Sequence, residues 1–238
     1  YQGKRGVKLK NNRAVLNGAA FENGVIDFDV AFPPNRAFVG VNFRADDDAN
    51  YEEFYLRPHQ SGNPDANQYC PVISRTASWQ LYYGEGYSAP VKYPFDQWFH
   101  VRLVVSGRQM EVYVGDLETP ALFVSDLKRV PRPGGLALES FLGEARFANF
   151  SFRNEANPPM KGKPTPPAPA PPGTVMAWQV SGSFAEKKLA NALHLTRAEK
   201  DSLTWTTATP EPTGLLNLAS VTPWSRERNT AFARLVID

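Results

Sequence analysis

The chain has 238 residues, with 42% apolar and 21% charged residues, which is an ordinary globular composition and excludes a fibrous or wholly disordered protein. Its 26 Lys and Arg against 24 Asp and Glu give a formal net charge of +2, which excludes the strongly basic surface that binds nucleic acid or anionic lipid.

Cysteine usage and hydropathy narrow the class of protein further. Cys70 is the only cysteine, so an internal disulfide framework and a zinc site of paired cysteines are excluded. No apolar run reaches the roughly 18 residues that a membrane-spanning helix needs, so we expect no membrane span. We also expect no signal peptide in the first residues.

Apolar and polar residues alternate with period two through the first two thirds of the chain. In residues 25–30, for example, Ile26 and Phe28 share one side of a predicted strand, and Asp27 and Asp29 share the other. The predicted strands cover residues 25–30, 38–44, 51–59, 98–105, 110–114, 136–139 and 147–152. Because long helical periodicity is absent, the pattern predicts an all-β fold of two antiparallel sheets packed face to face.

The region 157–173 contains eight of the 21 prolines, which predicts an extended and semi-stiff spacer. We therefore expect a β-sandwich at 1–156, a Pro-rich linker at 157–173, and a small or truncated β-rich segment at 174–238. In that last segment we predict one helix at 185–201. The predicted strands there cover 174–180, 203–207 and 229–238.

Several of these runs together resemble a known family. Residues 21–30, 38–44, 51–59, 98–105 and 110–114 resemble concanavalin A-like lectin/glucanase domains of the laminin-G-like kind, and the match extends over residues 3–153. The chain is also similar to bacterial secreted proteins of the glycoside hydrolase or 3-keto-disaccharide hydrolase-like kind. The resemblance implies a jelly-roll sandwich and a secreted, periplasmic or cell-envelope location. It leaves the function open, because this fold hosts lectins, glycosidases and adhesion modules.

A glucanase of this fold is expected to carry its carboxylates on one strand as Glu-x-Asp-x-x-Glu, because two carboxyls must flank one glycosidic bond. The sequence contains no such triplet. Glu52 and Glu53 are adjacent, so on a strand they point to opposite sides and cannot act together. The remaining catalytic candidates are Glu139, Glu111 and His59, and we favour a protein without catalytic activity.

A polar set lies opposite the apolar residues of the predicted strands and has the chemistry of sugar recognition. Arg, Asn and His side chains form hydrogen bonds to hydroxyls, and aromatic rings stack on the apolar face of a pyranose. The predicted ligand-binding residues are Asn42, Arg44, Tyr55, Arg57, His59, Arg102 and Tyr113. This prediction requires that Arg44, Arg57 and His59 share one hollow. A solvated sheet face with cross-strand ion pairs is the alternative.

A glycine-rich aromatic stretch and an acidic loop are two further candidates. The aromatic residues Trp79, Tyr82, Tyr83 and Tyr87 form either a stacking platform or cross-strand packing. Residues Asp46, Asp47, Asp48 and Asn50 offer the hard oxygen ligands that calcium prefers, and a polar turn explains them equally.

The leading hypothesis from the sequence is a lectin-like, carbohydrate-associated binding module without catalysis and without a cofactor other than calcium. A glycoside hydrolase or keto-sugar hydrolase-like enzyme is the first alternative. A structural or adhesion module of a larger envelope protein is the second. The expected partner is a carbohydrate, and the sequence predicts neither the sugar nor the oligomeric state.

Overall fold

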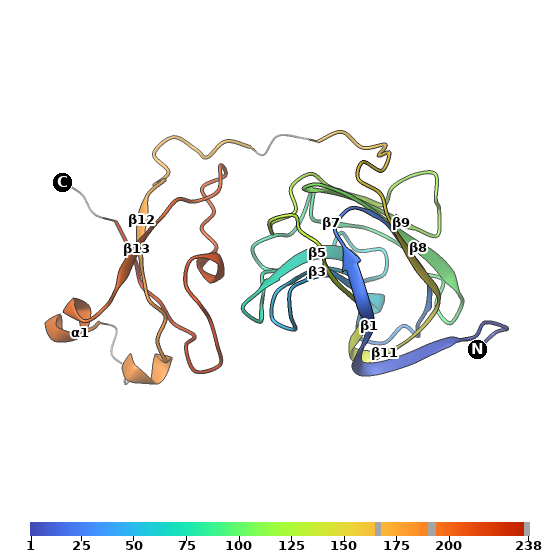
Figure 1. The fold of residues 1–238 in the computed structure, drawn as a ribbon, viewed down its shortest axis with the longest axis horizontal. Coiled ribbons are helices and arrows are strands. Elements are labelled where there is room, and N and C mark those ends of the chain that lie inside the picture. The colour runs from blue at the N-terminus through green and yellow to red at the C-terminus, as the bar shows by residue number, and fades with distance from the viewer. Residues whose placement is uncertain (165–167, 190–193, 236–238) are drawn as a thin grey trace. The chain divides into compact units, whose positions relative to one another are not determined.

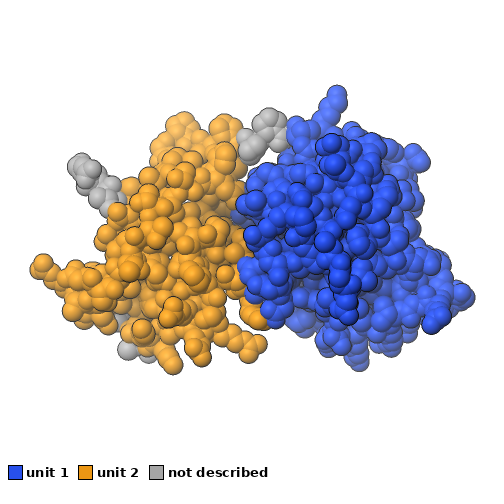
Figure 2. All heavy atoms as spheres, in the orientation of Figure 1, with its two compact units in different colours: residues 1–72, 77–165 blue, residues 73–76, 166–238 orange. Residues whose placement is uncertain are grey.

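A computed structural model describes residues 1–164, 168–189 and 194–235. The chain divides into two compact units, one formed by residues 1–72 and 77–165 and the other by 73–76 and 166–238 (Figure 2). The predicted linker at 157–173 therefore spans the division near residue 165. Within the described ranges, no helix is long and apolar enough to cross a membrane.

The regular secondary structure of the first unit consists almost entirely of strands (Figure 1). They are β1 (Gly6–Phe21), β2 (Gly24–Ala31), β3 (Phe38–Ala45), β4 (Tyr51–Leu56), β5 (Asn67–Ile73), β6 (Thr76–Ala77), β7 (Ser88–Ala89), β8 (Phe99–Ser106), β9 (Gln109–Val114), β10 (Leu122–Val124) and β11 (Gly134–Asn154). A short 3-10 turn, η1 (Pro58–Gln60), follows β4. The strands form one 11-stranded sheet in the order β10-β9-β8-β2-β11-β3-β4-β5-β6, with β1 paired to β11 and β7 paired to β5.

Strand β11 makes this sheet curl into two layers. Its first half pairs with β3, where Glu139 lies opposite Gly40, and its second half pairs with β2, where Phe147 lies opposite Val30. Leu142 adopts a φ of 59° between the two halves. The layers enclose a core of fully buried side chains that includes Phe28, Phe43, Phe54, Leu103 and Phe147. The predicted two-layer antiparallel jelly-roll sandwich is thus confirmed.

The boundaries of some predicted strands differ from the structure. The strands predicted at 136–139 and 147–152 are parts of the single strand β11. Strand β4 ends at Leu56 rather than at residue 59, because Pro58 has no N–H group for a strand ladder and begins η1. Strand β5 was not predicted, since Pro71 interrupts its pattern.

The second unit holds a three-stranded sheet of β12 (Trp178–Ser181), β13 (Trp205–Ala208) and β14 (Ala233–Arg234). Its helical turns are η2 (Glu186–Leu189), α1 (Arg197–Asp201) and η3 (Leu218–Ser220). The continuous helix predicted at 185–201 is wrong, because residues 194–196 are not helical and a capping box of Thr196 and Glu199 starts α1 afresh. Residues 190–193, which carry part of the predicted apolar stripe, lie outside the described ranges.

Gly40 of β3 lies where two backbones approach closely, because a Cβ at this position would come within 1.9 Å of the Phe54 carbonyl oxygen. We expect Gly40→Ala to lower the free energy of unfolding by about 1–3 kcal/mol in urea denaturation, as overpacking does. Gly135→Ala in β11 is the control, since its Cβ would meet Ala45 at an ordinary 3.6 Å. Equal stabilities for the two variants would contradict this account.

Candidate functional site

One side of the layer formed by β1, β11, β3, β4 and β5 carries a group of polar side chains turned away from the core. We call this side the polar face. Its members alternate with core residues such as Val41, Phe54 and Leu138, as a pleated strand requires. The polar face contains Arg13, Asn42, Tyr51, Glu53, Tyr55, Gln68 and Glu139, and Arg57 extends it just beyond β4.

Neighbouring side chains hold the guanidinium of Arg57 in place. Its Nη1 donates to Asp65 Oδ2 at 2.6 Å, and its Nη2 donates to Gln68 Oε1 at 2.6 Å and to the Tyr55 hydroxyl at 3.2 Å. The same group lies over the rings of Phe38, Tyr55 and Trp79, at 5.3–5.8 Å from the ring centroids. A cation fixed in this way loses little further conformational freedom when a ligand binds.

Gln68 connects the polar face to residues 78–87, which we call the aromatic loop. Its Oε1 accepts hydrogen bonds from Arg57 and from Tyr55, and its Nε2 donates to the carbonyl oxygens of Trp79 at 2.8 Å and Tyr82 at 2.6 Å. All four hydrogen-bonding positions of the amide are therefore filled. The loop is held from beneath by a buried side chain.

A pocket of about 380 Å³ lies between the aromatic loop and the end of the polar face. Arg57, Asp65, Gln68, Trp79 and Tyr83 are among the residues that line it. Trp79 remains 46% exposed and Tyr83 70% exposed, although large aromatic side chains normally bury most of their surface. The pocket thus combines accessible rings with fixed polar groups, as small-molecule sites do.

A second cluster on the polar face centres on Glu139. Its Oε2 accepts hydrogen bonds from Arg13 Nη2 at 3.0 Å and from Asn42 Nδ2 at 2.7 Å. Arg13 also donates to the Tyr51 hydroxyl at 3.0 Å and lies over that ring, 4.7 Å from its centroid. These contacts hold the Glu139 carboxylate beside β3.

Glu53 lies directly opposite Asn42 in the β3–β4 register. Burial of its side chain, and secondarily the charge of Glu139, raise the pKa of Glu53 to about 8, although Arg13 acts in the opposite direction. Glu53 is therefore largely protonated at neutral pH, and Glu139 next to it is bound to a cation. The two carboxyls have different surroundings on one sheet face.

The polar face brings together some of the predicted ligand-binding residues. Asn42, Tyr55 and Arg57 lie on it, and His59 in η1 packs edge-on against Phe38, with ring centroids 5.6 Å apart. Burial, followed by the charges of Arg36 and Arg57, lowers the pKa of His59. A binding role for these residues stays a prediction.

Arg44 does not join them, so the predicted hollow shared by Arg44, Arg57 and His59 is wrong. Its φ of 50° and the register shift between Gly135 and Ala137 turn its side chain out of the strand alternation. The guanidinium instead donates to the carbonyl oxygens of Glu22 and Gly107, each at 2.7 Å.

The predicted residues of β8 and β9 lie on the outer side of the other layer, so the core separates them from the polar face. Arg102 donates to Asp27 at 2.7 Å, and the Tyr113 hydroxyl donates to Glu111 at 2.8 Å. Glu111 is fully buried and also accepts a hydrogen bond from the backbone N–H of Gly162. The prediction that Arg102 and Tyr113 share a site with Arg57 is therefore wrong. Glu111 instead holds the segment after β11 through its hydrogen bond with Gly162.

In the acidic loop predicted as a calcium site, the carboxylates of Asp46 and Asp47 bind other groups of the protein. The Asp46 carboxylate pairs with Arg129 and Arg132, and Asp47 accepts hydrogen bonds from the Ala49 backbone and the Asn50 side chain. Across residues 1–164, 168–189 and 194–235, no group of three or more His, Cys, Asp or Glu side chains could hold a metal ion. The structure therefore does not support calcium at Asp46, Asp47, Asp48 and Asn50.

Sequence reasoning missed Gln68 and Asp65. Gln68 lies in β5, whose pattern Pro71 obscures, and Asp65 lies in the turn before that strand. The aromatic residues Trp79 and Tyr83 were noticed as a stacking platform or as packing residues. The local signal for this strand is that Gln68 and Cys70 alternate with Tyr69, which lies in the core.

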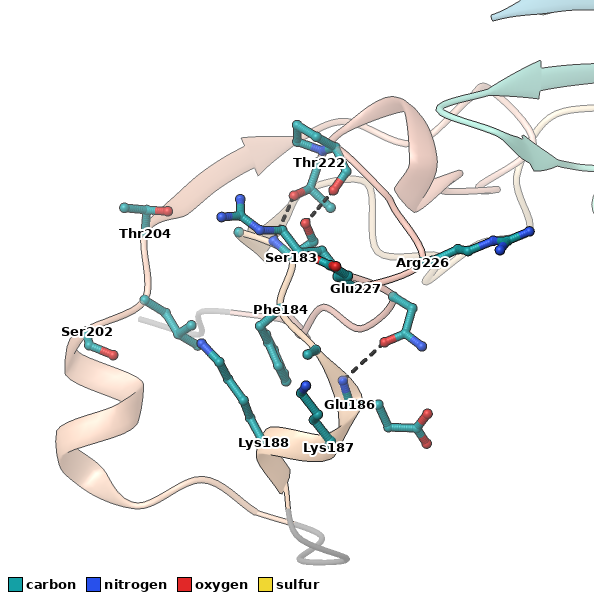
Figure 3. A pocket seen from close by; sticks show the side chains of 16 residues that line it. Ser183, Phe184, Glu186, Lys187, Lys188, Ser202, Thr204, Thr222, Arg226 and Glu227 are labelled. Carbon is teal, nitrogen blue, oxygen red and sulfur yellow. Dashed lines mark hydrogen bonds between the residues drawn. The ribbon is translucent and has the colours of Figure 1, made fainter. Parts of the chain in front are cut away.

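The second unit contains a larger pocket of about 880 Å³ (Figure 3). Cationic Lys187, Lys188 and Arg226 and anionic Glu186 and Glu227 line it together. Among the described lining residues the one aromatic ring is Phe184, which is buried and stacks on Phe232 with the centroids 5.3 Å apart. The mixed charges and the buried ring make it the weaker candidate.

We expect Glu53→Gln to stabilise the protein at neutral pH. A carboxyl whose pKa rises from 4.5 in the unfolded chain to about 8 in the folded protein stabilises the fold most below pH 4.5, and this contribution is lost as pH rises towards 8. The variant should gain on the order of 3 kcal/mol over the wild type between pH 4.5 and pH 7. Thermal unfolding of both proteins across this range measures the difference, and parallel curves would contradict the raised pKa.

Comparison with other proteins gives likenesses of fold alone. No protein-family model matches the chain, and no curated protein matches it in sequence. Among solved structures, the carbohydrate-binding module CBM66 from Bacillus subtilis is 14% identical with a TM-score of 0.47, and the match covers 64% of this chain and 98% of that one. CG-16, a homodimeric agglutinin from chicken liver, is 13% identical with a TM-score of 0.46, covering 60% of this chain and 100% of that one. Chicken galectin 2 is 9% identical with a TM-score of 0.43, covering 61% and 100%.

Proposed function

We propose that the first unit binds a neutral saccharide in the pocket between the aromatic loop and the polar face. The observation that carries this proposal is the exposure of Trp79 and Tyr83 beside a fixed guanidinium–carboxylate pair, Arg57 and Asp65. A pyranose has an apolar face, which stacks on rings, and a rim of hydroxyls, which both donate and accept hydrogen bonds. The pocket supplies partners for both parts.

The charges near the pocket favour a neutral ligand over an anionic one. The guanidinium of Arg57 is paired with Asp65 at 2.6 Å, so it offers hydrogen bonds without a net positive charge. Glu139 on the same face is ion-paired with Arg13. A sulfated or uronic sugar would meet the carboxylate of Asp65, which lines the pocket, and like charges at short range oppose binding.

The pocket is also preorganised, which supports selective binding. Gln68 holds the loop carbonyls of Trp79 and Tyr82 and the side chains of Tyr55 and Arg57 at the same time. A ligand that enters this pocket does not have to order these groups, so little of its binding free energy is lost to ordering.

We expect Trp79→Ala and Tyr83→Ala each to weaken saccharide binding by about tenfold, equivalent to about 1.4 kcal/mol, because each removes a stacking surface. Isothermal titration calorimetry with neutral oligosaccharides measures the loss. Leu81→Ala is the matched control, since Leu81 belongs to the same loop, is 39% exposed and does not line the pocket. The proposal fails if the wild type binds no neutral saccharide, or if Leu81→Ala weakens binding as much as the ring variants do.

A further inference from the structure

The second unit contains a further pocket of about 360 Å³, to which β13 contributes Trp205 and β14 contributes Ala233 and Arg234. This volume falls within the range of about 300–1,000 Å³ that small-molecule sites occupy. The other lining side chains come from residues 194–203 and from Phe232, which precedes β14. The positive charge of the pocket and its apolar walls together indicate the class of ligand that fits it.

Arg234 and Trp205 lie on the same side of the three-stranded sheet. Arg234 pairs with Gln179 of β12, and Trp205 pairs with Ser181, two residues further along that strand. The guanidinium carbon of Arg234 lies 3.8 Å from the centroid of the Trp205 ring, and its Nε donates to Gln179 Oε1 at 2.9 Å. The two Nη nitrogens have no hydrogen-bond partner among the residues that the structure describes, so they are available to a ligand.

The pocket carries positive charge without a compensating carboxylate. Of its eight lining residues, Lys200 and Arg234 are cations, His194 is the third titratable group, and none is Asp or Glu. Glu199 and Asp201, which flank Lys200 in the chain, are engaged elsewhere, the first in the capping box of α1 and the second in an i,i+4 ion pair at 3.8 Å. In residues 1–164, 168–189 and 194–235, neither Lys200 nor Arg234 forms an ion pair. An anion in this pocket therefore meets two unpaired cations.

Apolar side chains form the other walls of the pocket, and contacts with the sheet hold them in place. Leu195 is buried, and the ring of Phe232 stacks on that of Phe184 with the centroids 5.3 Å apart. The backbone N–H of Ser181 donates to the carbonyl oxygen of Phe232 at 2.8 Å, and the N–H of Phe232 donates to Ser181 Oγ at 2.9 Å. Together with Leu203, these side chains offer a surface on which an apolar group can be buried.

We propose that this pocket binds an organic acid that joins one carboxylate to an apolar group. The two Nη nitrogens of Arg234 donate to the two carboxylate oxygens, which the planar guanidinium matches in geometry. Lys200 supplies a second positive charge, and the apolar group packs against Leu195, Leu203 and Phe232. The pocket belongs to the second unit, so this proposal does not depend on saccharide binding by the first.

The apolar walls favour a carboxylate over a phosphate ester. Transfer of an ionised group from water to apolar surroundings costs free energy, and a doubly charged phosphate costs more than a singly charged carboxylate. A carboxylate next to an apolar group has two sources, a free acid and the C-terminal residue of a peptide. Both present the same chemistry to Arg234, and the experiment below distinguishes them.

The test titrates the full chain with three small ligands. They are 3-phenylpropionate, its amide, which keeps the apolar group and lacks the charge, and acetate, which keeps the charge and lacks the apolar group. Heteronuclear NMR measures each Kd, and the indole N–H signal of Trp205, assigned with Trp205→Phe, shows whether the ligand binds at this pocket. We expect a Kd of about 1 mM or lower for 3-phenylpropionate and at least about tenfold weaker binding of the other two.

Two variants and a matched control test the roles of the cations. Arg234→Gln should weaken 3-phenylpropionate binding by at least about tenfold, because it removes charge-assisted hydrogen bonds. Lys200→Gln should weaken it by about threefold, because an ammonium group on a flexible side chain adds charge but no fixed geometry. Arg226→Gln is the control and should keep the wild-type Kd, since Arg226 is an exposed arginine of the same unit that lines the other pocket. Thermal unfolding shows whether each variant is folded.

Three results would overturn the proposal. They are the absence of 3-phenylpropionate binding up to about 10 mM, equal Kd values for the acid and its amide, and equal losses of affinity in Arg234→Gln and Arg226→Gln. If Arg234→Gln does not fold, unchanged binding by Lys200→Gln overturns the proposal instead.

A fourth ligand, N-acetyl-alanyl-phenylalanine, separates the two sources of the carboxylate. Binding at least as tight as that of 3-phenylpropionate identifies the C-terminal residue of a peptide as the ligand. Weaker binding identifies a free acid.

Discussion

The shared strand β11 is the constraint on which the architecture depends. Because it pairs with β3 over one half and with β2 over the other, while β1 follows it along the opposite edge, a single hydrogen-bonded sheet closes around the core. The bend at Leu142 lets one strand serve both layers. The same strand places Glu139 beside Asn42. The pairing of β11 therefore determines both the curl of the sheet and the position of the Glu139 carboxylate.

The two outer surfaces of the first unit use polar residues differently. On the layer of β2 and β8, both ring nitrogens of His100 contact carboxylates, Asp29 at 2.8 Å and Asp27 at 2.9 Å. Burial alone would raise the pKa of Asp29, but hydrogen bonds from Lys4, His100 and Asn149 outweigh it and lower the pKa. These charges satisfy one another. On the polar face, atoms of Arg13 and Asn42 are instead left unpaired.

This contrast is why the polar face is the better candidate for a site. A half-buried carboxyl with a raised pKa reduces stability at neutral pH, and such groups are typical of places where proteins bind or transform a ligand. Gln68 joins this region to the aromatic loop through four hydrogen bonds, so the loop that carries the rings is attached to the polar face. Rigid support from a sheet is what precise positioning requires.

Local alternation in the sequence determined the strands near β2, β3, β4, β8 and β9 and the side of the strand on which Asn42, Tyr55 and Arg57 lie, because side-chain direction follows from the pleat. It could not foresee the left-handed backbone of Arg44, which removes that residue from the polar face. Nor could it pair Glu53 with Glu139 or bring Gln68 under the aromatic loop. Register between distant strands is set by long-range packing and hydrogen bonding, and only the tertiary structure decides it.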